Sequence, residues 1–155
     1  MPVTVDITDA AWTERGDPTP IAERAVAAAL AHEHENYDTC EISLLFAGDD
    51  EASRINKDWR DKSYAPNVLS FPAPASATPA GEARFLGDIV LAAGTVSREA
   101  AEQGKPLEAH VAHLIVHGTL HLLGYDHMYE PDAARMEGAE IEILRGLGLP
   151  NPYVT

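Results

Sequence analysis

The sequence has little cysteine, little positive charge and no long apolar run. Its single cysteine, Cys40, rules out an intramolecular disulfide. Nothing near it in the sequence suggests a nucleophile, so we expect a small buried side chain. Eleven Lys and Arg stand against 25 Asp and Glu, for a net charge of −14, which argues against binding to nucleic acid or anionic lipid by bulk charge alone. No stretch approaches the roughly 18 apolar residues of a membrane-spanning helix.

The N-terminus also lacks the features of a secretory signal. Asp6 and Asp9 lie where such a signal has basic residues followed by an apolar run, so we expect a cytoplasmic protein that does not engage a membrane. Hydrophobic residues make up 45% of the chain and charged residues 23%, which predicts a folded globular protein. The length suits a single domain, which we place at residues 1–155.

Apolar periodicity and the positions of glycine and proline predict a mixture of helices and strands. Ile21, Ala25 and His32 recur at helical spacing, and Gly124 stops a helix that begins at Pro106. The pattern predicts helices at about 19–37, 51–61, 94–104, 106–123 and from 131, strands at about 41–46, 68–71 and 88–92, and a Pro- and Ala-rich loop at 72–81. Strands in the middle and helices toward the C-terminus favour an α+β fold, with a small mixed sheet packed against helices.

The most informative stretch is HGTLHLLGYDH at residues 117–127. His117 and His121 are one helical turn apart, so their imidazoles share a helix face. Gly124 can take a positive φ, end the helix and turn the chain so that His127 folds back toward the pair. Three neutral imidazoles with one open position are typical of catalytic zinc sites. We therefore predict one Zn²⁺ ion on His117, His121 and His127.

Other interpretations of the histidines have to be weighed against this one. His110, His113, His117 and His121 share one broad helix face, which could be a polar stripe, and spacing alone would also allow His113 and His117 to chelate together. Only the pair at 117 and 121 is followed by a glycine turn and a third histidine at metal-site spacing. We assign His113 to supporting the site or to packing. The two histidines at 32 and 34 have no such context and are expected on the surface.

The position after the first predicted ligand is Gly118. In the zinc-protease motif H-E-x-x-H this position is a Glu that acts as general base. The chain therefore has the ligand spacing of such hydrolases without their base, which argues against peptide hydrolysis. A negatively charged substrate would instead need cationic help.

Residues 54–62, RINKDWRDK, can supply that help. This segment holds four of the eleven basic residues and carries a net charge of +2. For Arg54 and Lys57 we expect an exposed helix face. Arg60 and Lys62 lie close before the strand at 68–71 and are better placed to face a site. The planar donors of an Arg suit phosphate oxygens and the charge that develops in phosphoryl transfer.

Together these residues resemble the YbeY family of bacterial endoribonucleases. The resemblance is carried by HGTLHLLGYDH at 117–127, QGKPLEAH at 103–110, LGDIVLA at 86–92, and Asn56, Arg60, Lys62 and NVLSFP ending at Pro72. These motifs span most of residues 41–150 in family order. The resemblance implies an α+β fold related to the zinc metalloproteases, a zinc ion on the three histidines and a functional Arg60.

The same resemblance implies the activity. It suggests a zinc-dependent hydrolase that cuts single-stranded RNA, acts in 3′-end maturation of 16S rRNA and in ribosome quality control, and works with the small ribosomal subunit or a ribosome-associated protein. No DNA substrate is expected. The alternatives are a zinc-dependent hydrolase of a peptide or small molecule and a non-enzymatic ribosome assembly factor with a structural metal. Whether water on the metal or the RNA 2′-hydroxyl attacks stays open.

Overall fold

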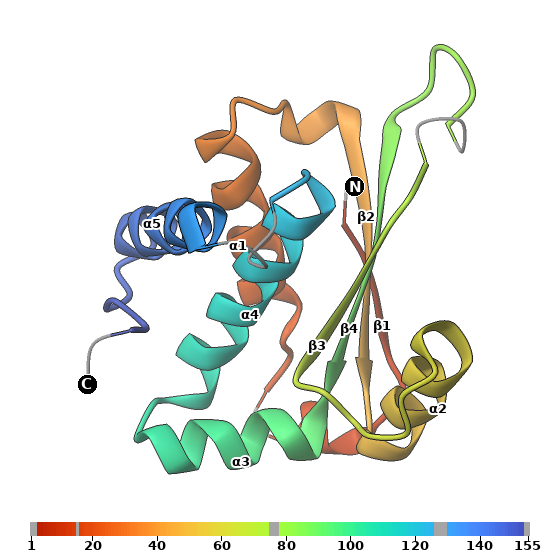
Figure 1. Ribbon diagram of the computed structural model, residues 1–155, viewed down its shortest axis with the longest axis vertical. Coiled ribbons are helices and arrows are strands. Elements are labelled where there is room, and N and C mark those ends of the chain that lie inside the picture. The colour runs from red at the N-terminus through yellow and green to blue at the C-terminus, as the bar shows by residue number, and fades with distance from the viewer. Residues whose placement is uncertain (1–2, 15, 75–77, 126–129, 154–155) are drawn as a thin grey trace.

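The computed structural model describes residues 3–14, 16–74, 78–125 and 130–153 (Figure 1). In chain order, its elements are β1 Val3–Ile7, a 3₁₀ turn Ala10–Trp12, α1 Thr19–His32, a 3₁₀ turn Tyr37–Thr39, β2 Cys40–Ala47, α2 Asp49–Arg60, β3 Val68–Pro72, β4 Arg84–Ala92, α3 Ala93–Gln103, α4 Leu107–Leu122 and α5 Glu130–Gly146. The strands form one sheet in the order β1-β2-β4-β3, in which β1, β2 and β4 are parallel and β3 is antiparallel to β4. The predicted α+β fold with a small mixed sheet is confirmed.

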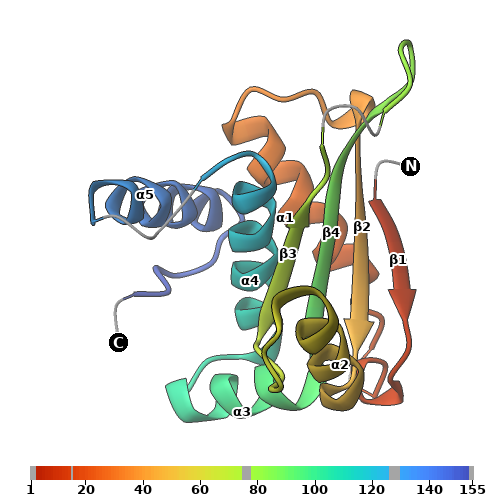
Figure 2. The ribbon, with the colours of Figure 1, turned by 45° about the vertical axis from the view of Figure 1, so that its right-hand side comes forward.

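The two faces of the sheet have different partners, because successive residues of a strand point to opposite sides. Ile42, Leu44 and Phe46 of β2 are fully buried in the core that the sheet forms with α1 and α4. On the other face, Leu45 and Val90 belong to a smaller apolar cluster that includes α2. Figure 2 shows α1, α4 and α5 on one side of the sheet and α2 on the other.

Helix α4 is the central helix of the core, and ten of its sixteen residues are buried. It approaches the sheet closely at Gly118, where an added Cβ would lie 3.1 Å from both Ile89 Cδ1 and Ser70 Oγ. The helix ends as the sequence predicts. Gly124 has a φ of +104°, its N–H donates to the carbonyl of His121, and the N–H of Tyr125 donates to the carbonyl of Leu120. This is the Schellman pattern, in which glycine is favoured.

Two boundaries differ clearly from the sequence prediction, and one strand was not predicted. The first helix ends at His32 instead of about residue 37, because His34 has a φ of +59° and the chain leaves the helix there. Strand β4 begins at Arg84, four residues before the predicted start. Strand β1 was missed, since it is an edge strand in which only Val3 is buried and its pairing partner β2 lies far along the chain.

Two further predictions concern Cys40 and the membrane. Cys40 is buried at the start of β2, as expected for a small core residue, and burial raises the pKa of its thiol. In the part of the chain that the structure describes, no helix combines the length and apolar character needed to cross a membrane.

Candidate active site

Two of the three predicted metal ligands lie side by side on α4. The ring centroids of His117 and His121 are 4.7 Å apart, with the rings nearly perpendicular at 83°. Nδ1 of His117 lies 3.3 Å from Oε2 of Glu140, and Nδ1 of His121 lies 2.9 Å from the carbonyl oxygen of Tyr125. The third predicted ligand, His127, lies outside the described residues.

The partners of the two Nδ1 atoms determine which nitrogen of each ring can bind a metal. A carbonyl oxygen can only accept a hydrogen bond, so Nδ1 of His121 carries the proton. An ionised carboxylate also only accepts, which assigns the same tautomer to His117. In a neutral imidazole protonated at Nδ1, the lone pair is on Nε2, the nitrogen that can bind a cation. Such anchoring of Nδ1 by a carboxylate or carbonyl is usual for metal-binding histidines.

The described residues do not complete a metal site by themselves. Among residues 3–14, 16–74, 78–125 and 130–153, no three His, Cys, Asp or Glu side chains are grouped so that they could hold a metal ion. The pair of anchored histidines nevertheless fits a divalent cation that prefers imidazole nitrogen. The described part therefore contains the pair at 117 and 121, and His127 stays a prediction.

Glu140 of α5 is the carboxylate that anchors His117, and it is almost completely buried, with 1% of its surface exposed. Its Oε1 lies 2.5 Å from Nε2 of His113 and accepts a 2.8 Å hydrogen bond from the hydroxyl of Tyr153. Burial alone would raise the pKa of Glu140, but hydrogen bonds from His113 and His117 outweigh it and lower the pKa to about 2. Glu140 is therefore ionised at neutral pH.

Tyr153 and His113 both contact the same carboxylate oxygen of Glu140. Their rings meet edge to face with centroids 5.5 Å apart. Burial, followed by the neighbouring charge of Glu140, raises the pKa of Tyr153, so its hydroxyl keeps its proton and donates. Lys105 donates from Nζ to the carbonyl of Pro152 at 2.8 Å, which ties the segment before Tyr153 to the loop between α3 and α4.

His110, one turn before His113 on α4, belongs to a separate polar cluster. Its Nε2 lies 2.8 Å from Oε1 of Glu99 on α3, and the same carboxylate accepts hydrogen bonds of 2.9 and 3.3 Å from the amide of Asn67. Burial lowers the pKa of His110, against the raising effect of Glu99. The cluster links α3, α4 and the segment before β3, and the structure assigns His110 to packing.

The backbone anchor of His121 is itself held in place. The Tyr125 hydroxyl donates to Oε2 of Glu33 at 3.1 Å, and the guanidinium of Arg135 lies 5.6 Å from the centre of the Tyr125 ring. Glu33 also lies 2.7 Å from Nδ1 of His32, whose Nε2 lies 2.8 Å from Glu142 of α5. His32 is thus a half-buried bridge between helices, and the expected surface position holds only for His34, which is exposed.

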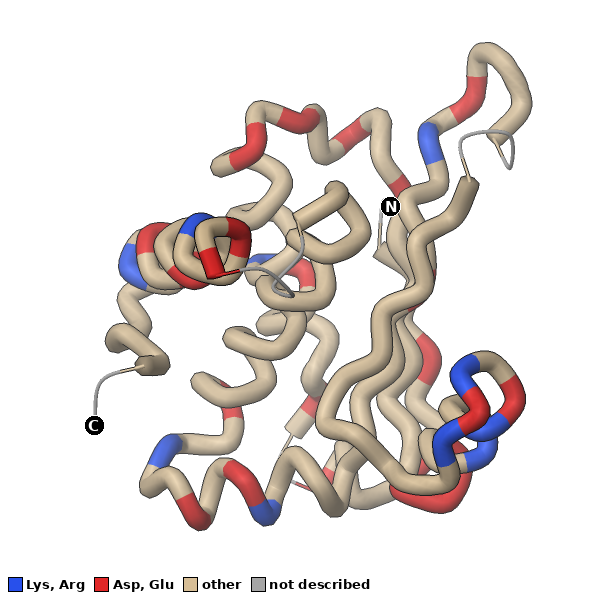
Figure 3. Tube along the Cα trace, in the orientation of Figure 1, with Lys and Arg blue, Asp and Glu red and all other residues tan. Residues whose placement is uncertain are grey.

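The structure does not bring Arg60 to the histidine pair. Arg60 is the last residue of α2, which packs on the sheet face opposite α4. It is exposed, as is Lys62 two residues later. Figure 3 shows several Lys and Arg on and just after α2, interspersed with Asp and Glu of the same helix, and further residues of both signs on the other helices. The predicted cationic segment is therefore a surface feature of the other face.

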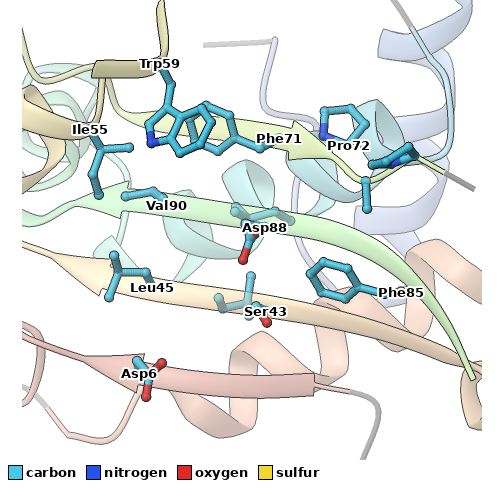
Figure 4. A pocket seen from close by; sticks show the side chains of 14 residues that line it. Asp6, Ser43, Leu45, Ile55, Trp59, Phe71, Pro72, Phe85, Asp88 and Val90 are labelled. Carbon is cyan, nitrogen blue, oxygen red and sulfur yellow. The ribbon is translucent and has the colours of Figure 1, made fainter. Parts of the chain in front are cut away.

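On that face, the sheet and α2 enclose a groove of about 570 Å³ (Figure 4). Trp59, 76% exposed, projects over it from α2 and lies 6.4 Å from Phe71 of β3, measured between ring centres. Phe85 lines the groove farther along, and Ser43, Asp6 and Asp88 line its polar part. Burial raises the pKa of Asp88. Aromatic rings next to a cationic helix end suit stacking and phosphate contacts, whereas the two carboxylates oppose a polyanion.

The loop that follows Arg60 is held by side chains far apart in the sequence. Asn56, buried on α2, donates to the carbonyl of Tyr64 at 3.0 Å, and the hydroxyl of Thr95 donates to the carbonyl of Ala65 at 2.9 Å. The loop carrying Lys62 is thus fixed between α2 and α3. This gives Asn56, one of the residues on which the family resemblance depends, a structural role.

Glu140, Glu99 and Tyr153 were not predicted from the sequence. For Glu140 a signal was present: it lies on the stripe of Met136, Ala139 and Ile143 that faces the core, where a carboxylate needs a partner. The contacts of Glu99 with His110 and of Tyr153 with Glu140 have no comparable signal.

Comparison with known proteins gives a consistent result. The family model described as Endoribonuclease YbeY matches residues 9–148. Proteins named Endoribonuclease YbeY from Dinoroseobacter shibae, Ruegeria pomeroyi and Sinorhizobium fredii are 48%, 46% and 42% identical to this chain, covering 98%, 97% and 99% of it and 91%, 98% and 92% of their own lengths. A solution structure of a Thermotoga maritima protein shares the fold, with a TM-score of 0.59 and 18% identity over 99% of both chains.

Proposed function

The chain belongs to the YbeY endoribonuclease family, and on that premise we propose that it is a zinc-dependent endoribonuclease that cuts single-stranded RNA. Residues 1–155 act as one catalytic domain. The proposed role is 3′-end maturation of 16S rRNA and ribosome quality control in the cytoplasm, together with the small ribosomal subunit or a ribosome-associated protein. DNA is not a substrate.

The observation that carries this proposal is the anchoring of both rings of the pair through Nδ1, to Glu140 and to the Tyr125 carbonyl. His117 and His121, with His127 as the third ligand, would hold one zinc ion. When bound, zinc supplies Lewis acidity that polarises a phosphoryl oxygen and acidifies water. The chain's own contribution is to fix two imidazoles in the tautomer that presents Nε2 and to keep their anchors buried.

Arg60 is proposed to contact the RNA backbone and to neutralise phosphate charge. Because α2 and α4 pack on opposite faces of the sheet, an RNA strand that contacts both Arg60 and the histidine pair would bend around the sheet edge formed by β3. Arg60 is therefore proposed to bind a phosphate neighbouring the one at the histidine pair.

Peptide hydrolysis is the weaker alternative, and the packing of Gly118 argues against it. This position faces Ile89 and Ser70 of the sheet, so the space next to the first ligand has no room for the Glu side chain of the protease motif. A non-enzymatic assembly factor with a structural metal is the other alternative. Removal of the metal separates the two roles, because loss of the fold indicates a structural ion, whereas a folded, inactive protein indicates a catalytic one.

The central test is cleavage of an RNA that has a duplex and single-stranded ends. H117A should remain folded, bind no zinc and leave the single-stranded part intact. H34N is the matched control, since His34 is exposed and Asn tolerates its positive φ. The ends of the products decide the nucleophile: a cyclic phosphate indicates the 2′-hydroxyl, and a plain phosphate end indicates water. Full activity of H117A would refute the proposal.

A further inference from the structure

We propose that Glu140 is the positioning residue of the metal site: it holds His117 in the tautomer and orientation that turn Nε2 toward the cation. This inference rests on the proposed function, because it assigns a residue on another helix to the same site. Glu140 comes from α5, 23 residues after His117, and reaches the pair across the α4–α5 contact.

The two oxygens of the carboxylate have separate tasks. Oε1 accepts from Nε2 of His113 and from the hydroxyl of Tyr153, and Oε2 faces Nδ1 of His117. Two donors on Oε1 fix the plane of the carboxylate, so Oε2 cannot turn away from His117 without breaking both. Glu140 is 1% exposed and His117 is 23% exposed, so the carboxylate is the more deeply buried of the two partners.

The same contacts assign opposite tautomers to two histidines on one helix. His113 donates to Glu140 through Nε2, so its proton is on Nε2 and its lone pair on the buried Nδ1, which has no hydrogen-bond partner among the described residues. His117 faces Glu140 through Nδ1, which leaves the lone pair on Nε2. The same carboxylate therefore assigns His113 to supporting Glu140 and His117 to presenting Nε2 to the cation.

Charge balance also favours a positioning role. A buried carboxylate is costly unless it is paired or fully hydrogen-bonded, and here three side-chain donors compensate it. A second carboxylate of α5, Glu142, contrasts with Glu140. It is 67% exposed and contacts His32 instead of the histidine pair. The two carboxylates share a helix and a charge and differ in whether they touch the site.

The first experiment uses the unaltered protein without metal. Long-range ¹H–¹⁵N spectra of the imidazoles at about pH 8, where an ordinary histidine is neutral, report which ring nitrogen carries each proton. We expect Nδ1–H for His117 and His121 and Nε2–H for His113. An Nε2–H tautomer at His117 would overturn the inference, and this measurement does not depend on whether any variant folds.

The second experiment compares zinc affinity, measured by competition with a chromogenic chelator, in the wild type, E140Q and E108Q; Glu108 of α4 is 68% exposed and pairs with Arg24 of α1. Loss of an outer carboxylate of this kind weakens metal binding about 10- to 100-fold, which we expect for E140Q, whereas E108Q should stay within about 3-fold of the wild type. Y153F, which removes one donor to Oε1, should fall between the two. The Co²⁺-loaded proteins add a spectroscopic signature, since a turned His117 alters the visible absorption bands.

The outcomes separate this inference from the proposed function. Wild-type protein that binds zinc and an E140Q variant that binds it equally well would overturn the inference alone. Wild-type protein that binds no zinc would overturn both. A folded E140Q protein with weakened zinc binding, altered Co²⁺ bands and the tautomers given above would support both.

Discussion

Replacing Gly118 by Ala tests how α4 is placed on the sheet. Gly118 lies in the middle of a helix, where Ala is favoured over Gly by about 1 kcal/mol. The new Cβ, however, would lie 3.1 Å from Ile89 Cδ1, 3.2 Å from Ile89 Cγ2 and 3.1 Å from Ser70 Oγ. Ile89 is fully buried, so it has little room to move. Overpacking of this kind costs about 1–3 kcal/mol, and G118A should therefore be less stable than the wild type by up to about 2 kcal/mol.

Gly138 of α5 provides the matched control. It is also a mid-helix glycine, but it is exposed and a Cβ there meets nothing within 4 Å. G138A should gain the helical preference alone, about 1 kcal/mol, or roughly 2–4 °C in melting temperature for a chain of this size. The difference between the two variants isolates the packing cost, since the helical preference cancels. Urea unfolding with unchanged m-values measures it. Equal stabilisation by both substitutions would refute the close approach of α4 to β3 and β4.

Three further predictions concern charge. R60A should raise KM for RNA and lower kcat/KM about 5- to 30-fold, the effect of losing about 1–2 kcal/mol from one phosphate contact. R54A, on the same helix, should have little effect. Equal kinetics for both variants at low and moderate salt would exclude a role for Arg60. Hydrogen bonding to Glu142 raises the pKa of His32 despite partial burial, so its contribution to stability is fully present below the unfolded-state value of 6.5 and is lost as the pH rises through the folded-state value. The cost of H32Q in urea unfolding should accordingly be larger at about pH 5.5 than at about pH 9. Burial lowers the pKa of His110, so its contribution to stability is present above the unfolded-state pKa of 6.5 and is lost as the pH falls. H110Q should therefore make the fold less sensitive to acid. An unchanged acid-unfolding curve would contradict this.

The sequence predicted the parts of the site that are local. The spacing of His117 and His121 and the helix end at Gly124 depend on helix geometry and on the positive φ of one glycine, and both are visible in eleven residues of sequence. Glu140 could not be placed in the same way, since its contact with His117 depends on how α5 crosses α4. A carboxylate on an apolar stripe predicts a buried partner without naming it.

The position of Arg60 is a different case. The sequence places it shortly before β3, and β3 packs directly against α4, which made a shared site plausible. The sheet nevertheless lies between Arg60 and the histidine pair, because α2 packs on one face of the sheet and α4 on the other. Order along the chain therefore does not decide on which face of a sheet a helix packs. Only the tertiary structure shows which face of the sheet α2 covers.

The net charge of −14 and the separation of the two faces together constrain how RNA can bind. Most of the surface repels a polyanion, and the densest cationic segment lies on and just after α2, across the sheet from the histidine pair. On the proposed function, a bound RNA strand contacts cations at one face and the histidine pair at the other, with the edge strand β3 between them. Few phosphates can be neutralised in this way, so free RNA should bind weakly and lose affinity as salt rises through counterion release. Tight, salt-resistant binding of arbitrary RNA would show that another surface carries the interaction, whereas a large gain in affinity on adding the small ribosomal subunit would show that a partner supplies the missing positive charge.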